Sequence, residues 1–212
     1  MAPTVNRWVE PEWARQYLDR RESIPHRGEG YAAVLELLAF GGPIRRVLDL
    51  GTGDGHTLGR VLAAHPDAVG VGLDFSTEML GRARASFGDD PRVEIHEHDL
   101  DRPLPDELGS FDLVVSSFAI HHCVPERQRD LYREVFEHLT PGGRLVNLEH
   151  VASPTPALHE EFLAALDAEE DPSNKLVAVD TQLGWLRDIG FADVDCFWKW
   201  RELALLSGRR PG

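Results

Sequence analysis

VLDLGTGDG, residues 47–55, is the stretch of the sequence that decides the fold. A short apolar run, typical of a buried parallel strand, leads directly into a loop with three glycines. Glycines after a strand let the backbone turn tightly, and they let a ligand approach where a Cβ atom would clash. The stretch therefore predicts a strand, a ligand-binding loop and a helix in succession, which is the first unit of an α/β sheet.

The spacing between this loop and a following acidic residue indicates the kind of ligand. The next apolar run, residues 69–74, ends on Asp74, which lies 23 residues after Gly51. In a doubly wound sheet, an acid at the end of the second strand is placed to accept hydrogen bonds from both hydroxyl groups of a ribose. The loop and the acid together predict a nucleoside-containing ligand at the carboxyl ends of the first two strands.

Apolar runs and helical patterns alternate along the rest of the chain. Further strands are predicted at residues 93–96, 111–116, 144–149, 193–200 and 203–207. The last two runs are joined by a short connection, which forces an antiparallel hairpin because a parallel crossover needs a dozen or more residues. The alternation predicts an α/β fold with a mostly parallel sheet and helices on both faces.

Two local signals refine the bounds of these elements. Ser76 precedes a helical pattern that runs to Phe87, and its hydroxyl group is predicted to cap that helix. Residues 140–143, TPGG, predict a turn that separates a helix from the strand at 144–149.

The chain is predicted to form a single domain. Its expected parts are a helical cap, a cofactor-binding core, a lid insertion, and a C-terminal helix with a hairpin, at residues 1–43, 44–150, 151–182 and 183–212. The first helix of the cap carries Trp8, Trp13 and Tyr17, and the insertion carries a helix near 156–169. Both regions are expected to cover the carboxyl ends of the strands and to form an acceptor pocket there.

The composition excludes several classes of protein. The 22 Lys and Arg residues face 36 Asp and Glu residues, and the resulting formal net charge of −14 disfavours a nucleic-acid partner. No apolar run approaches the roughly 18 residues of a membrane span, and the first residues lack the apolar core of a secretion signal. Two cysteines cannot make a disulfide framework. We therefore expect a cytoplasmic protein that does not act in a membrane.

Nicotinamide dinucleotides are the main competitors for the glycine loop. Their fingerprint requires a third glycine where His56 stands, and Asp49 would face the pyrophosphate from two residues before the first glycine. A carboxylate at this place suits a cationic ligand better. The residues of the loop therefore disfavour a nicotinamide-dependent oxidoreductase.

Several segments together resemble the class I S-adenosylmethionine-dependent methyltransferases. The similar segments, in the order and spacing of that family, are DLGTGDG at 49–55, GLDFS at 72–76 followed by Met79 and Leu80, HDL at 98–100, FDLV at 111–114 and LTPGG at 139–143. The resemblance covers roughly residues 44–208. It implies a Rossmann-like, seven-stranded sheet with an antiparallel last strand, and S-adenosylmethionine as the cofactor with S-adenosylhomocysteine as its product.

The resemblance also implies which residues bind the cofactor. By similarity, the methionine part is held by Asp49 and the backbone of Gly51, Thr52 and Gly53, the ribose by Asp74, the adenine by Phe75, Met79, Asp99 and Leu100, and the floor under the sulfonium is formed by Ser117 and Phe118.

The segment SIPHR, residues 23–27, is similar to the segment that caps the cofactor in bacterial carboxy-S-adenosylmethionine synthases. That match places the two-pronged guanidinium of Arg27 on the cofactor carboxylate. The synthases also bind an extra carboxylate with an arginine after the fifth strand, whereas here no arginine occurs between Arg144 and Arg187. The departure favours ordinary methyl transfer.

Histidines follow the fourth strand, on the side of the sheet where the methyl group is expected. Methyl transfer is an in-line displacement that depends on positioning, and a hydroxyl or protonated amine acceptor also needs a base. His122, and after it His121, is the predicted base, with Glu149 and His150 as further candidates. The three side chains from His121 to Cys123 diverge, so no metal site is expected.

The acceptor is expected to be a small molecule. The sequence leaves open its identity, the atom that is methylated, and whether the chain forms a homodimer. Two other functions also stay open: a domain that binds S-adenosylmethionine without catalysis, and an enzyme that modifies the cofactor itself, by use of a carboxylated form or by cyclisation.

Overall fold

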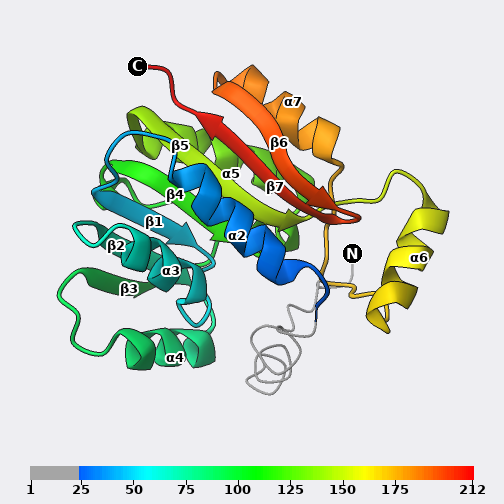
Figure 1. Ribbon diagram of the computed structural model, residues 1–212, viewed down its shortest axis with the longest axis horizontal. Coiled ribbons are helices and arrows are strands. Elements are labelled where there is room, and N and C mark those ends of the chain that lie inside the picture. Colours follow the sequence, from blue (N-terminus) through cyan, green and yellow to red (C-terminus); the bar gives the residue numbers. More distant parts are fainter. Residues whose placement is uncertain (1–23) are drawn as a thin grey trace.

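Seven strands form one sheet in the order β3-β2-β1-β4-β5-β7-β6 (Figure 1). The computed structural model describes residues 24–212, and the predicted helix with Trp8, Trp13 and Tyr17 lies outside this range, as does Ser23. The strands are β1 (Arg46–Leu50), β2 (Val69–Asp74), β3 (Val93–Glu97), β4 (Phe111–Ser117), β5 (Leu139–His150), β6 (Ala192–Trp200) and β7 (Leu203–Arg209). All seven strands expected from the sequence are present.

The first five strands are parallel to one another, and β7 is antiparallel to both β5 and β6. The chain winds outward from β1 to β3 on one side and continues through β4 on the other side, so the strand order reverses between β1 and β4. In open α/β sheets, ligands bind in the crevice outside the carboxyl ends of the strands at such a reversal. The expected Rossmann-like fold is confirmed, and its topology places a binding site beside the glycine loop.

Helices cover both faces of the sheet (Figure 1). They are α2 (Arg27–Leu38), α3 (His56–Ala64), α4 (Thr77–Phe87), α5 (Pro125–His138), α6 (Pro156–Leu166) and α7 (Val179–Ile189), with short 3₁₀ helices η2 (Asp106–Leu108) and η3 (Ile120–His122). Successive side chains of a strand point to opposite faces. Leu113 and Val115 of β4 therefore belong to the core under α2 and α3, whereas Val114 belongs to the core under α5 and α7.

Two local predictions are wrong. Ser76 does lie at the start of α4, but its side chain makes no capping hydrogen bond, because the carboxylate of Asp74 organises this turn and accepts from the Ser76 backbone N–H at 2.8 Å. Residues 140–143 form no separate turn, since β5 begins at Leu139 and includes them. Gly142, with a φ of 82°, and a shift in the register of β4 against β5 absorb the irregularity.

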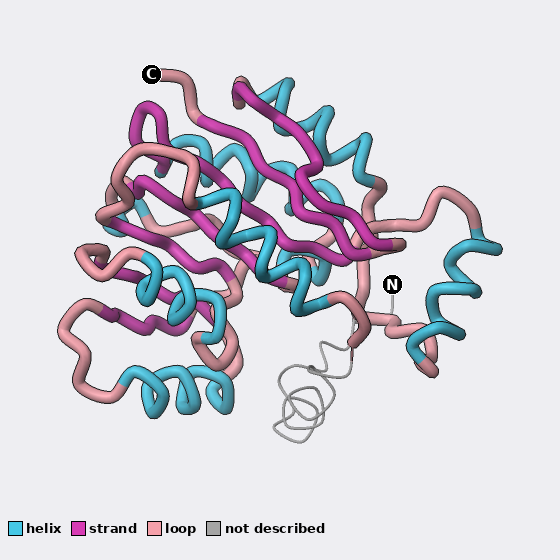
Figure 2. Tube along the Cα trace, in the orientation of Figure 1, coloured by secondary structure: helices cyan, strands magenta, loops and turns pink. Residues whose placement is uncertain are grey.

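The segment between β5 and α7 carries α6 out beyond the carboxyl end of β5 (Figure 2). The helix ends at Leu166, earlier than the expected 169, and α7 already begins at Val179. Phe162 is the one residue of α6 that is fully buried. The helix therefore faces the edge of the sheet where the glycine loop lies, and it leaves most of its surface exposed.

Candidate functional site

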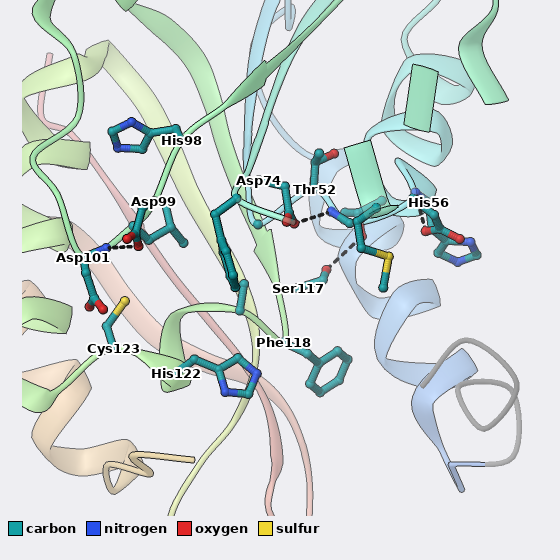
Figure 3. A pocket seen from close by; sticks show the side chains of 18 of the residues that line it. Thr52, His56, Asp74, His98, Asp99, Asp101, Ser117, Phe118, His122 and Cys123 are labelled. Carbon is teal, nitrogen blue, oxygen red and sulfur yellow. Dashed lines mark hydrogen bonds between the residues drawn. The ribbon is translucent and has the colours of Figure 1, made fainter. Parts of the chain in front are cut away.

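A cavity with an open volume of about 880 Å³ lies at the carboxyl ends of β1, β2 and β4. Figure 3 shows Asp99, Asp101 and Cys123 on one side of it and His56 on the other, with Phe118 and His122 between them. The predicted cofactor residues that line it are Arg27, Gly51, Thr52, Gly53, Asp74, Phe75, Met79, Asp99, Leu100, Ser117 and Phe118. The structure thus brings eleven of the twelve predicted residues to one cavity.

The glycine loop turns from β1 into α3 over the floor of the cavity. Gly51 and Gly53 have φ values of 67° and 58°, in the left-handed region that favours glycine. A Cβ atom on Gly51 would lie 2.2 Å from the Cβ of Ala119, whereas one on Gly53 would meet nothing within 4 Å. Gly51 is therefore needed for packing against the chain after β4, and Gly53 leaves the space that a ligand would fill.

Asp74 connects the end of β2 to this loop. Its Oδ2 accepts from the backbone N–H of Gly53 at 2.9 Å, and its Oδ1 accepts from that of Ser76 at 2.8 Å. Burial raises the pKa of the carboxyl group, while these backbone donors oppose the shift. Each oxygen keeps lone-pair capacity for a further donor, so the carboxylate can accept two hydroxyl groups from a ligand while it holds the loop.

Asp49 is the one predicted cofactor residue that does not line the cavity. It lies beneath the loop with 1% of its surface exposed, and Thr52 donates to its Oδ2 at 2.7 Å. Burial raises the pKa of Asp49 to about 7, and the neighbouring Asp74 contributes in the same direction. Its Oδ1 accepts no hydrogen bond from the part of the chain that the structure describes. Such a buried carboxylate would be stabilised by a positive charge in the cavity above it, which fits the sulfonium and ammonium groups of S-adenosylmethionine.

The far end of the cavity is formed by the loop after β3. The Oδ1 of Asp99 accepts from the backbone N–H of Asp101 at 3.0 Å, and Arg127 donates to the carbonyl oxygen of Leu100 at 2.6 Å. Arg127 is held in turn by Glu134, whose carboxylate lies 2.5 Å from the guanidinium. Both Arg127 and Glu134 belong to α5, so this helix fixes the loop that carries the predicted adenine site.

The near end of the cavity is formed by Arg27, Ser117 and Phe118. The guanidinium carbon of Arg27 lies 4.2 Å from the ring centroid of Phe118, and Arg27 donates to the hydroxyl group of Tyr31 at 3.2 Å. Phe118 has a φ of 54°, which is rare for an aromatic residue and concentrates at functional sites. Thr57 donates to the Oγ of Ser117 at 2.9 Å. The buried guanidinium of Arg27 and the ring of Phe118 thus pack together at this end of the cavity.

A second cavity, of about 840 Å³, lies between α6 and the carboxyl ends of β4 and β5. Its walls are formed mainly by apolar side chains of α6 and by four histidines, His121, His122, His150 and His159. Three residues line both cavities, namely Arg27, Phe118 and His122. The two cavities therefore meet at one junction, which is where the sequence placed the methyl group.

His121 and Glu149 form a buried pair at the second cavity. The Nδ1 of His121 lies 2.5 Å from the Oε1 of Glu149, and the backbone N–H of His121 donates to Oε2 at 3.2 Å. Burial raises the pKa of Glu149 to about 7 and lowers that of His121. The two groups are in direct contact, so a proton that enters the pair is shared between the ring and the carboxylate.

A chain of buried hydrogen bonds leads from this pair into the core. Asn147 donates to Glu149 at 3.5 Å and to the hydroxyl group of Tyr132 at 3.0 Å, and Tyr132 donates to Gln182 at 2.6 Å. These residues are at most 1% exposed. A buried polar chain is costly unless its members are paired, and here it fixes the orientation of Glu149.

His122 differs from its neighbour although both belong to η3. Its ring lies at the junction of the two cavities, and its Nδ1 is 3.3 Å from the Oγ of Ser173. Burial lowers the pKa of His122 to about 3. The ring is therefore neutral at pH 7, and it accepts a proton much less readily than the pair of His121 and Glu149.

Several lining residues were not predicted. They are Tyr31, Asp54, His56, Thr57, His98, Asp101, Ala119 and Cys123 of the first cavity, with His159 and Phe162 of the second. Tyr31 follows Arg27 by one helical turn, and this spacing was the available signal for it. Within residues 24–212, no group of three His, Cys, Asp or Glu side chains is arranged to hold a metal ion. No helix in this range is long and apolar enough to cross a membrane.

Known proteins share both the sequence pattern and the fold. A family model described as a methyltransferase domain matches residues 47–143. A demethylmenaquinone methyltransferase from Clavibacter sepedonicus is 33% identical over 169 residues, which are 71% of this chain and 66% of that protein. The uncharacterized methyltransferase sll0829 from Synechocystis is 30% identical over 191 residues, 89% of this chain and 86% of that protein.

Among solved structures, human N-acetylserotonin methyltransferase in complex with S-adenosylmethionine matches with a TM-score of 0.71 and 17% identity, over 100% of this chain and 61% of that chain. At this identity, the match shows a common fold. The chain spans about half to two thirds of the length of the first curated relatives that it matches.

Proposed function

Because the chain belongs to the class I S-adenosylmethionine-dependent methyltransferase family, we propose that it transfers a methyl group from S-adenosylmethionine to a small-molecule acceptor. The observation that carries the proposal is the junction of the two cavities at Arg27, Phe118 and His122. A cofactor in the first cavity supplies an electrophilic methyl group, and the junction gives an acceptor in the second cavity access to it.

In this proposal, each end of the first cavity recognises one part of the cofactor. Asp74 accepts hydrogen bonds from the ribose, and Asp99 accepts from the adenine amino group. The glycine loop approaches the methionine part, with Asp49 stabilising its positive charge from below. Arg27 pairs with the carboxylate, because a guanidinium offers it two parallel donors. Support for these roles comes from the placement of the side chains and from the free space at Gly53.

Catalysis would then depend on positioning and on the removal of a proton. Methyl transfer needs the attacking atom and the methyl group held in line, and exclusion of water prevents competing solvation of the attacking atom. Phe118 and the buried face of α6 exclude water from the junction. For an acceptor that carries a proton, we propose His121 as the base and Glu149 as the residue that positions it. His122, which the sequence favoured, would instead line the path of the methyl group.

Parallel calorimetric titrations with S-adenosylmethionine, S-adenosylhomocysteine and NAD test the cofactor. We expect the first two to bind with micromolar affinity and NAD not to bind. Binding of NAD alone would contradict the proposed function. Binding of the cofactor without a methylated product from any acceptor would favour the non-catalytic alternative.

The assignment of the base is tested by His121→Ala and His122→Ala in the presence of an acceptor. We expect normal cofactor binding in both variants, and at least a tenfold lower kcat for His121→Ala, within the range that general base catalysis supplies. His96→Ala, at an exposed position away from both cavities, is the matched control. A larger loss of kcat in His122→Ala than in His121→Ala would return the role to His122.

A further inference from the structure

We propose that the acceptor is a neutral, largely apolar molecule with one weakly acidic hydroxyl group, a phenol or an enol, and that its oxygen is methylated. The inference rests on the proposed function, and it names the substrate class of the second cavity. It follows from three properties of that cavity: apolar walls, a buried cation at the inner end and acidic residues at the outer rim.

The walls favour a flat apolar body. Phe162 of α6 is 1% exposed and contacts the rings of His150 and Trp200, with centroid distances of 5.4 and 6.0 Å. Leu163 and Leu166 line the cavity from the same helix, and Leu203 lines it from β7. An aromatic or apolar ring placed between these side chains removes apolar surface from water, and stacking adds to this gain.

The inner end favours a developing negative charge. Arg27 is 5% exposed, and its guanidinium stacks on Phe118 at the junction of the cavities. In the proposed complex this guanidinium neutralises the cofactor carboxylate, so an attacking oxygen meets no negative charge at the junction. A protonated amine has no lone pair for attack until it loses a proton, whereas an oxygen that gains negative charge as it attacks lies beside the guanidinium. The junction therefore favours a hydroxyl acceptor over an amine.

The outer rim disfavours acidic acceptors. Glu169, Glu170 and Asp171 follow one another along the edge of the cavity, and Glu169 and Glu170 are exposed. The charge of Glu170 is offset in part by His159, whose Nε2 lies 2.5 Å from it. Asp171 accepts from the backbone and the hydroxyl group of Ser173 at 2.9 and 2.8 Å, bonds that leave its charge in place. A carboxylate or phosphate that enters past this rim is repelled, whereas a neutral molecule is not.

The pair of His121 and Glu149 completes the argument. In the transfer, the acceptor oxygen forms a bond to the methyl carbon, the bond from that carbon to sulfur breaks with its electrons left on sulfur, and the hydroxyl proton passes to the pair. A histidine in contact with a carboxylate removes the proton of a phenol or an enol much more readily than that of an aliphatic alcohol, because the phenol or enol is the stronger acid. The pair of His121 and Glu149, the apolar walls of the second cavity and the charged groups at its two ends thus favour the same class of acceptor.

A matched set of 2-naphthol, 2-naphthylmethylamine and 2-naphthoate tests the inference, because the three probes share one naphthalene body and the amine is protonated at neutral pH. Their dissociation constants are measured by calorimetry on protein saturated with S-adenosylhomocysteine, and methyl transfer is followed by mass spectrometry with S-adenosylmethionine. We expect 2-naphthol to bind at least tenfold more tightly than either other probe and to give its methyl ether.

Tighter or equal binding of the amine or the acid would overturn the inference, and so would methylation of either in preference to the naphthol. Binding of none of the three probes, or binding of 2-naphthol without ether formation, would overturn it as well. Failure of the proposed function is recognised separately, since S-adenosylhomocysteine and S-adenosylmethionine would then not bind, or no acceptor of any class would be methylated.

Charge reversal at the rim tests the electrostatic part. Glu169→Lys should lower the preference for 2-naphthol over 2-naphthoate severalfold. Glu160→Lys makes the same change of charge at an exposed position of α6 that does not line the cavity, and it should leave the preference unchanged. Equal effects of the two variants would contradict a role for the rim in selecting the acceptor.

Discussion

Two alanine substitutions in the glycine loop should separate its packing from its ligand space. In Gly51→Ala, the new Cβ would lie 2.2 Å from the Cβ of Ala119, so the chain after β4 must move. In Gly53→Ala, the new Cβ meets no protein atom within 4 Å and projects from a residue that lines the first cavity. Both residues adopt positive φ values, of 67° and 58°. The backbone cost is therefore common to both variants, and the clash belongs to Gly51→Ala alone.

The magnitudes follow from these contacts. A left-handed conformation costs an alanine about 1–2 kcal/mol relative to a glycine, and overpacking adds about 1–3 kcal/mol. The free energy of unfolding should therefore fall by about 2–5 kcal/mol in Gly51→Ala and by about 1–2 kcal/mol in Gly53→Ala. For a chain of this length, the latter corresponds to a Tm lower by about 2–8 °C. The affinity of Gly53→Ala for S-adenosylmethionine should fall at least tenfold, or about 1.4 kcal/mol, because a methyl group occupies the space of the ligand.

Urea denaturation gives the unfolding free energies, and calorimetric titration at a temperature where each variant is folded gives the affinities. Gly142→Ala is the matched control, since Gly142 also has a positive φ, of 82°, and lies outside the first cavity. It should lose stability like Gly53→Ala and keep the wild-type affinity. The reasoning is refuted if Gly53→Ala binds S-adenosylmethionine as the wild type does, or if Gly51→Ala is no less stable than Gly53→Ala.

Three further predictions concern charged groups. Burial raises the pKa of Asp49 to about 7, above its value in the unfolded chain. The stabilisation that this shift contributes to the free energy of unfolding is therefore complete below pH 4 and is lost as the pH rises through 7. In denaturation experiments from pH 4 to 8, the free energy of unfolding should fall less for Asp49→Asn than for the wild type. Asp74→Ala removes the two charge-assisted hydrogen bonds that we propose to the ribose, each worth about 1.5–3 kcal/mol, and should weaken the binding of S-adenosylmethionine accordingly; unchanged affinity in calorimetry would refute the assignment. His159 bridges α6 to Glu202, 2.8 Å from its Nδ1, and its acidic partners raise its pKa. This ion pair is complete below pH 6.5 and is lost as the pH rises through the raised value. The protection factors of the α6 amides, in which the intrinsic pH dependence of hydrogen exchange is divided out, should therefore be lower at pH 9 than at pH 6, and equal at both in His159→Ala.

The first cavity could be predicted from the sequence because its parts are local. The glycine loop, the acid at the end of β2 and the residues after β3 and β4 each follow a strand directly. Parallel strands bring their carboxyl ends to one edge of the sheet, so residues that are distant in the chain become neighbours once the fold is known. The one exception is Asp49, whose side chain belongs to β1 and points under the loop instead of into the cavity.

The sequence predicts an acceptor pocket under the insertion and several of its histidines, but the pairing of the polar groups around the second cavity could not be predicted because these groups pair over long distances. Glu149 and His121 are 28 positions apart, and Tyr132 and Gln182 are 50 apart. Glu202 lies between β6 and β7, yet it contacts His150 of β5 and accepts from Ser153 and contacts His159 in the insertion. No periodicity in the sequence relates these positions, since each pair is made by the packing of one element on another.

The two adjacent histidines show how the fold assigns different chemistry to equal residues. His121 and His122 both belong to η3 and their ring centroids lie 4.1 Å apart, but the polar partners of the two rings differ. The ring of His121 faces a carboxylate of β5, so a proton gained there is shared with a negative charge. The ring of His122 lies 3.3 Å from the hydroxyl group of Ser173, and burial outweighs the attraction of Glu149 and Asp171, so its pKa falls to about 3. A base must gain a proton when the acceptor loses one, and direct contact with a carboxylate assists that step at His121.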